Sequence, residues 1–134
     1  MAPRSKPIRP GPDSDEIRAA IRSFALGLPE AHEDFPWGES VAKVGKKVFV
    51  FMGMAYVPSD PTAPVSVSVK LPVSAPEALS YPWASPTGYG LGRSGWVSVS
   101  CPPAEVPEVE LFTDWIEESY RSIAPKKLVA RLDD

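Results

Sequence analysis

Apolar side chains between residues 17 and 28 repeat with the period of an α-helix. Asp13 followed by Glu16 is a capping-box pattern, and Gly27 with Pro29 is a typical stop signal. These features predict an amphipathic helix over residues 14–28. The apolar positions on its buried face are Ile17, Ala20, Ile21, Phe24, Ala25 and Leu28.

Alternation of apolar and polar positions replaces this pattern after residue 40. Segments 41–44 and 47–54 flank Gly45-Lys46, a pair typical of a two-residue hairpin turn. Alternation within the second segment predicts Phe49 and Phe51 on one face of the strand. The other face is then expected to carry Val48, Val50, Met52 and Met54.

Two later segments alternate more strictly and predict half-buried strands. Residues 65–71 place three valines and Leu71 on one face, and residues 96–101 place Val97, Val99 and Cys101 on one face. The segment 88–95 holds four glycines and is expected to form a hairpin or wing that leads into the second strand.

The last third of the chain is predicted to be helical. A helix is expected from about Pro107, and Pro125 interrupts it before a short amphipathic tail. A short helix is also expected from Ser74 to about Tyr81. The apolar side of the long helix carries Leu111, Phe112, Trp115, Ile116, Tyr120 and Ile123.

The order of these elements predicts the fold class. Strands and helices do not alternate as β-α-β units, so we expect an α+β fold with an antiparallel sheet and helices packed on one face. The other face suits base stacking and phosphate contact, because it would combine rings, hydroxyls and a lysine. Solvated serines and rings covered by loops would explain the same pattern. The residues expected there are Phe49, Phe51, Ser66, Ser68, Lys70, Trp96, Ser98 and Ser100.

Composition narrows the class of protein. The chain has 134 residues with one cysteine and one histidine, which excludes a disulfide or a Cys/His zinc cluster within one chain. Residues 1–12 contain four prolines and no apolar period, so they are expected to form a disordered tail before a single domain at 13–134. Without an apolar run of membrane length or a signal-peptide pattern, a cytoplasmic protein with no membrane partner is expected.

Charge is unevenly distributed along the chain. The net charge is −3, which is more acidic than is usual for a dedicated nucleic-acid binder. Residues 40–103 nevertheless carry five basic and two acidic side chains, whereas residues 104–134 carry eight acidic and four basic ones. The basic residues of the middle segment are Lys43, Lys46, Lys47, Lys70 and Arg93. A lysine-bearing hairpin also protects a sheet edge, which is the alternative explanation for three of them.

Candidates for catalysis are few. His32 lies beside Glu33 and Asp34 without an accompanying nucleophile, and Cys101 is expected to be a buried thiol. The glycines of 88–95 lead into a strand rather than a helix, which argues against a dinucleotide site. We therefore expect no enzyme activity, no cofactor and no metal.

Three segments in order resemble the MmcQ/YjbR family. They are residues 28–39 (LPEAHEDFPWGE) with the following hairpin 43–49 (KVGKKVF), residues 67–71 (VSVKL), and a Gly88-Tyr89 turn that leads to 96–99 (WVSV). Residues 125–128 (PKKL) are similar to the start of the family's C-terminal helix. The resemblance implies a CyaY-like (frataxin-like) sandwich with a double-wing DNA-binding motif. Its matched positions are Trp37, Lys70, Tyr89 and Trp96.

Three hypotheses about function follow. In the first, the protein binds DNA without catalysis, through Lys43, Lys46, Lys47, Lys70 and Arg93 and through the rings of Trp37, Tyr89 and Trp96. In the second, the same fold binds a protein or a small ligand and has no affinity for nucleic acid. In the third, the acids at 13–16 and 30–34 bind a metal, but helix capping and solvated loops explain those acids equally well.

Overall fold

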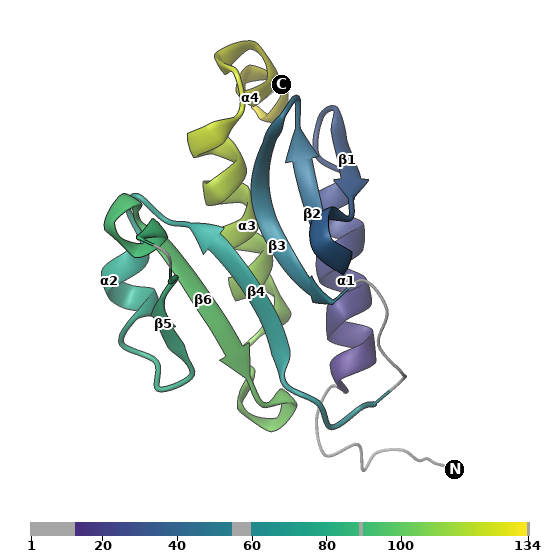
Figure 1. Ribbon diagram of the computed structural model, residues 1–134, viewed down its shortest axis with the longest axis vertical. Coiled ribbons are helices and arrows are strands. Elements are labelled where there is room, and N and C mark those ends of the chain that lie inside the picture. Colours follow the sequence, from purple (N-terminus) through teal and green to yellow (C-terminus); the bar gives the residue numbers. More distant parts are fainter. Residues whose placement is uncertain (1–12, 55–59, 89, 134) are drawn as a thin grey trace.

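The computed structural model describes residues 13–54, 60–88 and 90–133. The predicted disordered tail at 1–12 lies outside the described residues. In Figure 1 the long helices lie behind a curved sheet, and the other face of the sheet is turned to the viewer. None of the helices in the described ranges combines the length and apolar character that crossing a membrane requires.

The described strands form one antiparallel sheet in the order β1-β2-β3-β4-β6-β5. The predicted hairpin is confirmed, because Val44 pairs with Lys47 across the Gly45-Lys46 turn. The glycine-rich segment also connects two paired strands, β5 and β6, as predicted. The strands are β1 (Ala31–Asp34), β2 (Glu39–Val44), β3 (Lys47–Met54), β4 (Val65–Lys70), β5 (Ala84–Pro86) and β6 (Trp96–Cys101).

Two long helices cover one face of this sheet, which confirms the predicted α+β class. They are α1 (Ser14–Leu26) and α3 (Val109–Ile123). Each buries most of the apolar face that its periodicity predicts, but the prediction is wrong at Ala20 of α1, which is exposed. The sheet face away from them is called the open face below. The short elements are η1 (Pro36–Gly38), α2 (Ala75–Ala78), η2 (Leu91–Ser94), η3 (Pro103–Glu105) and α4 (Lys126–Leu132).

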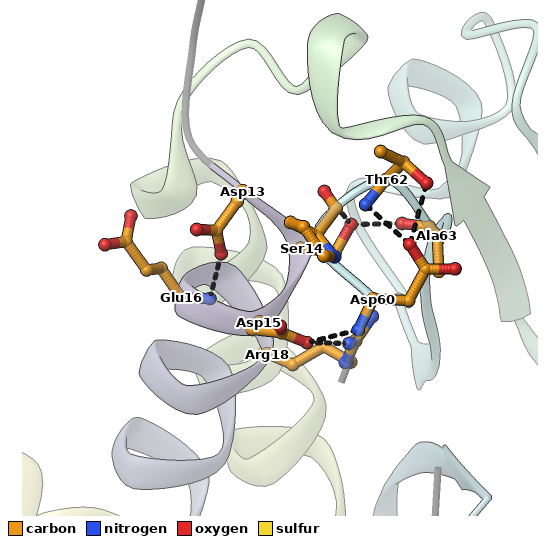
Figure 2. Close-up of polar contacts among 9 residues, drawn as sticks. Asp13, Ser14, Asp15, Glu16, Arg18, Asp60, Thr62 and Ala63 are labelled. Atoms are coloured by element: carbon orange, nitrogen blue, oxygen red, sulfur yellow. Dashed lines mark hydrogen bonds and ion pairs between the residues drawn. The ribbon is translucent and has the colours of Figure 1, made fainter. Parts of the chain in front are cut away.

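The beginning of α1 is fixed to the loop before β4 (Figure 2). Asp13 caps the helix by accepting a 2.8 Å bond from the Glu16 amide, as the capping-box pattern predicts. The buried Ser14 hydroxyl donates to the carbonyls of Pro61 and Ala63, 47 and 49 residues away. Polar side chains thus tie the start of the helix to this loop.

The prediction for the two faces of β3 is wrong at Phe49. Ala42 pairs with Val50 and Lys43 pairs with Val48, so Phe49 has no residue opposite it and forms a β-bulge. The bulge interrupts the alternation, and Val48 and Val50 fall on opposite faces. The Phe49 ring is fully buried against α3, 5.2 Å from the Tyr120 ring in an edge-on contact.

Two other segments differ from the predicted structure. Residues 31–34 were expected within a loop but form the edge strand β1, beside β2. The helix after Ser74 ends at Ala78, and the Ser74 hydroxyl does not cap it. That hydroxyl donates to Glu118 of α3 at 2.6 Å, and Glu118 also accepts the amides of Val73 and Ser74.

Strands β3 and β4 share fewer paired residues than any other neighbouring strands of the sheet. Only two residue pairs join these strands, Val50 with Val69 and Phe51 with Ser68. Beyond them the fully buried Ser119 hydroxyl of α3 stands between the strands. It accepts from the Lys70 amide at 2.9 Å and donates to the Phe49 carbonyl at 2.5 Å. A helix side chain therefore replaces a direct bond of the sheet.

Candidate nucleic-acid interface

The turn between β2 and β3, the end of β4 and the loop between β5 and β6 lie at the same end of the sheet, in the upper half of Figure 1. Because neighbouring strands are antiparallel, the β2–β3 turn, the C-terminal end of β4 and the β5–β6 loop share this end. We call it the hairpin end. Four of the predicted contact residues lie here: Lys46, Lys47, Lys70 and Arg93.

The first hairpin presents two lysines on a tight turn. Gly45 has a φ of +62°, the left-handed conformation that a two-residue hairpin turn uses and that glycine adopts without strain. Lys46 and Lys47 follow it and are both exposed. Neither forms an ion pair with another described residue. Their charges are therefore available to a ligand.

The second hairpin brings Arg93 to the same end as Lys70. Lys70 pairs with Trp96 in the sheet, and the Leu71 amide donates to the Gly95 carbonyl at 2.8 Å. Arg93 lies two residues before Gly95, in η2, and is exposed. Like Lys46 and Lys47, these two cations have no ion-pair partner in the part of the chain that the structure describes.

Lys43 lies on the open face but is already paired. Its ammonium is 3.2 Å from a carboxylate oxygen of Asp34, on the neighbouring strand β1. The Phe35 amide, and after it Lys43, hold the pKa of Asp34 below its ordinary value. A phosphate group would have to compete with this carboxylate for Lys43. The structure thus separates Lys43 from the four unpaired cations.

Aromatic residues of the predicted surface are less accessible than the sequence pattern indicates. Trp96 is only 9% exposed to solvent. Its ring contacts that of Phe51 edge-on, with 5.5 Å between the ring centroids. A base could stack on this indole only if the contact with Phe51 opened. Tyr89 and the side chain of Trp37 lie outside the described residues.

Hydroxyl groups form a row across the open face beside this aromatic pair. The hydroxyl oxygens of Ser68 and Ser98 are 2.8 Å apart, and that of Thr87 is 2.9 Å from Ser98. Serines 68 and 98 were expected on this face, and Thr87 was not. Only the register of β5 on β6 brings Thr87 to the row, so the one-dimensional pattern holds no signal for it.

Acidic residues proposed as a metal site are engaged elsewhere. Glu33 binds Arg22 of α1 and the Ser40 hydroxyl, and the Arg22 bond is the main cause that lowers the pKa of Glu33. Asp15 pairs with Arg18 and accepts the Asp60 amide (Figure 2). Within the described ranges, no three Asp, Glu, His or Cys side chains gather in a way that could hold a metal ion.

A groove of about 540 Å³ lies between α3 and the segment that follows β4. Its wall on α3 carries three carboxylates, of Asp114, Glu117 and Glu118, and its other wall is Pro72 with Val73. Arg121 is the single cation in the lining, and it is bound to Glu117 and Asp133. Phosphate groups would be repelled here, so the groove is not part of the candidate interface.

Comparison with known proteins identifies the family of this chain. No curated protein matches the chain. The family model of YjbR matches residues 26–122, which include all the strands named above and most of α3. This match covers more than half of the sequence, and we conclude that the chain belongs to the YjbR family.

Proposed function

We propose that this protein binds DNA without catalysis, through the unpaired cations of its hairpin end. The observation that carries the proposal is the convergence of Lys46, Lys47, Lys70 and Arg93, from two hairpins and a strand end, on one end of the sheet. Cations from separate segments can contact successive phosphates, which is how proteins are positioned on a nucleic-acid backbone.

The negative net charge is compatible with this function because ionic interactions are short-ranged in salt. Screening limits exposed charges to a distance of about 8 Å at physiological ionic strength. A bound phosphate therefore responds mainly to the side chains nearest to it. Several of the acids are neutralised locally, since Arg22, Arg121 and Arg131 each bind a carboxylate.

Phosphate contact, rather than base stacking, is the dominant part of the proposed interaction. Lys46, Lys47 and Arg93 are exposed, Lys70 is half-exposed and none of the four has an ion-pair partner among the described residues, whereas the Trp96 ring is nearly buried against Phe51. Binding of this kind depends little on base sequence and falls steeply with salt. Lys43 contributes less than the four unpaired cations because Asp34 competes for its charge.

Fluorescence anisotropy of a labelled DNA duplex, titrated with protein, tests the proposal. The wild-type affinity should fall at least tenfold between roughly 50 and 200 mM salt. The variant Lys47→Gln/Lys70→Gln should lose about 1.8 from the slope of log affinity against log salt, about 0.9 for each phosphate contact. A variant of equal charge, Ala19→Glu/Ala104→Glu, alters exposed positions on α1 and η3, away from the hairpin cations, and serves as the control.

Each outcome bears directly on the proposal. An unchanged slope in the lysine variant would refute the contact map. An equal loss in the control variant would show that net charge alone decides binding. Absence of binding by the wild-type protein at low salt would overturn the DNA proposal in favour of a module that binds a protein or a small ligand.

A further inference from the structure

The C-terminal helix α4 lies next to the first hairpin. Arg131 of α4 is 3.5 Å from a carboxylate oxygen of Glu30. Glu30 directly precedes Ala31, which pairs with Val44, the last residue before the Gly45-Lys46 turn. In Figure 1, α4 accordingly occupies the same upper end of the molecule as that turn. The chain therefore returns to the hairpin end with its final helix.

Several contacts fix α4 in this place. Leu128 is buried in the hydrophobic core, and the Arg121 guanidinium of α3 donates to Asp133 at 2.9 Å. The same guanidinium donates to Glu117 at 2.8 Å, which holds it in position for both carboxylates. Helix α4 and its side chains therefore have a fixed position relative to the rest of the protein.

Two lysines of α4 remain exposed and unpaired. Lys126 and Lys127 form no ion pair with another described residue, in contrast to Arg121 and Arg131 nearby. They stand in the first turn of the helix, where the helix dipole disfavours positive charge. Their charge therefore does not stabilise α4 through the helix dipole.

We infer that Lys126 and Lys127 make α4 a third contact segment for the phosphate backbone, beside the two hairpins. The inference rests on the proposed DNA binding and extends the contact surface from the two hairpins to helix α4. Arg131 in the last turn of α4 joins the helix to Glu30, beside the β2–β3 turn, and Lys126 and Lys127 lie in the first turn of the same seven-residue helix. A duplex that touches the β2–β3 turn would reach them by extending about 10 Å along α4. The lysine charges are free to contact phosphates, whereas the charges of Arg121 and Arg131 are neutralised by carboxylates.

The variant Lys126→Gln/Lys127→Gln tests this inference in the full chain with the same labelled duplex. Two lost phosphate contacts should lower the salt slope by about 1.8 and the affinity at 0.1 M salt by about eightfold per lysine. The variant should fold normally, since removing positive charge from the first turn favours the helix. The control of equal charge, Ala19→Glu/Ala104→Glu, should keep the wild-type slope.

The experiment distinguishes failure of this inference from failure of the proposed function. If the wild-type protein binds and Lys47→Gln/Lys70→Gln weakens binding while Lys126→Gln/Lys127→Gln has the wild-type slope, α4 is not a contact segment and the hairpin proposal stands. If the wild-type protein shows no salt-dependent binding, both fall. Circular dichroism of the α4 variant establishes that a lost slope does not result from unfolding.

Discussion

Replacing Ser119 by alanine should destabilise the fold strongly for such a small change. The hydroxyl is fully buried and satisfies two backbone groups, the Lys70 amide and the Phe49 carbonyl. An unsatisfied buried polar group costs about 1–3 kcal/mol, and alanine returns about 0.5 kcal/mol through its better helix propensity. Because Lys70 is only half-buried, the lower part of this range applies to its amide. We expect the free energy of unfolding to fall by about 1.5–3.5 kcal/mol.

Urea unfolding followed by tryptophan fluorescence measures this loss. With a typical dependence of about 1–3 kcal/mol per molar urea, the unfolding midpoint should move down by about 1–2 M. Ser122→Ala is the matched control, because its exposed hydroxyl donates to a carbonyl of the same helix. It should change stability by less than about 0.5 kcal/mol. Equal stability of the two variants would refute the bridging role of Ser119.

Three further predictions concern the pH dependence, the thiol and the second hairpin. The hydrogen bond from Arg22 of α1 keeps the pKa of Glu33 below its ordinary value. The ionised Glu33 side chain therefore stabilises the fold at pH values above the ordinary pKa of glutamate, and this stabilisation is lost as the pH falls through the lowered pKa. Glu33→Gln should therefore flatten the acid limb of a plot of melting temperature against pH, and an unchanged limb would contradict this. Burial raises the pKa of the Cys101 thiol to about 11. A thiol-reactive dye at pH 8 should therefore label Cys101 only after the protein is unfolded in urea. Rapid labelling of the native protein would disprove the burial of this thiol. A β-carbon at Gly92 would lie 2.8 Å from that of Pro86, so Gly92→Ala should cost about 1–3 kcal/mol in urea unfolding, whereas Gly88→Ala, in open space, should cost less than half as much.

The parts of the fold that were predictable are those whose signal is local. The period of α1, its Asp13 cap and the alternation of β4 and β6 each specify an element without knowledge of its neighbours. Strand β1 has no such signal, because its sequence, AHED, is mostly polar. Its pairing is supported by tertiary ion pairs, of Glu33 with Arg22 and of Asp34 with Lys43. Such contacts exist only after the chain has folded.

The candidate site shows the same limit. The sequence identifies lysines near a turn, but it does not distinguish Lys43, paired with Asp34, from the unpaired Lys46 and Lys47. The bulge that buries Phe49 is likewise absent from the alternating pattern, since it depends on the register with β2. Which of these cations contact DNA stays a prediction until the binding experiments are done.

The boundary between β3 and β4, where few residues pair, divides the sheet into two halves. Strands β1, β2 and β3 form one half with the first hairpin, and β4, β6 and β5 form the other half with the second. Two residue pairs and the Ser119 bridge join the two halves through hydrogen bonds, and the Phe51–Trp96 ring contact and the packing of β3 and β4 against α3 join them through side chains. Helix α3, which supplies Ser119 and packs against strands of both halves, therefore fixes the position of one hairpin and its cations relative to the other.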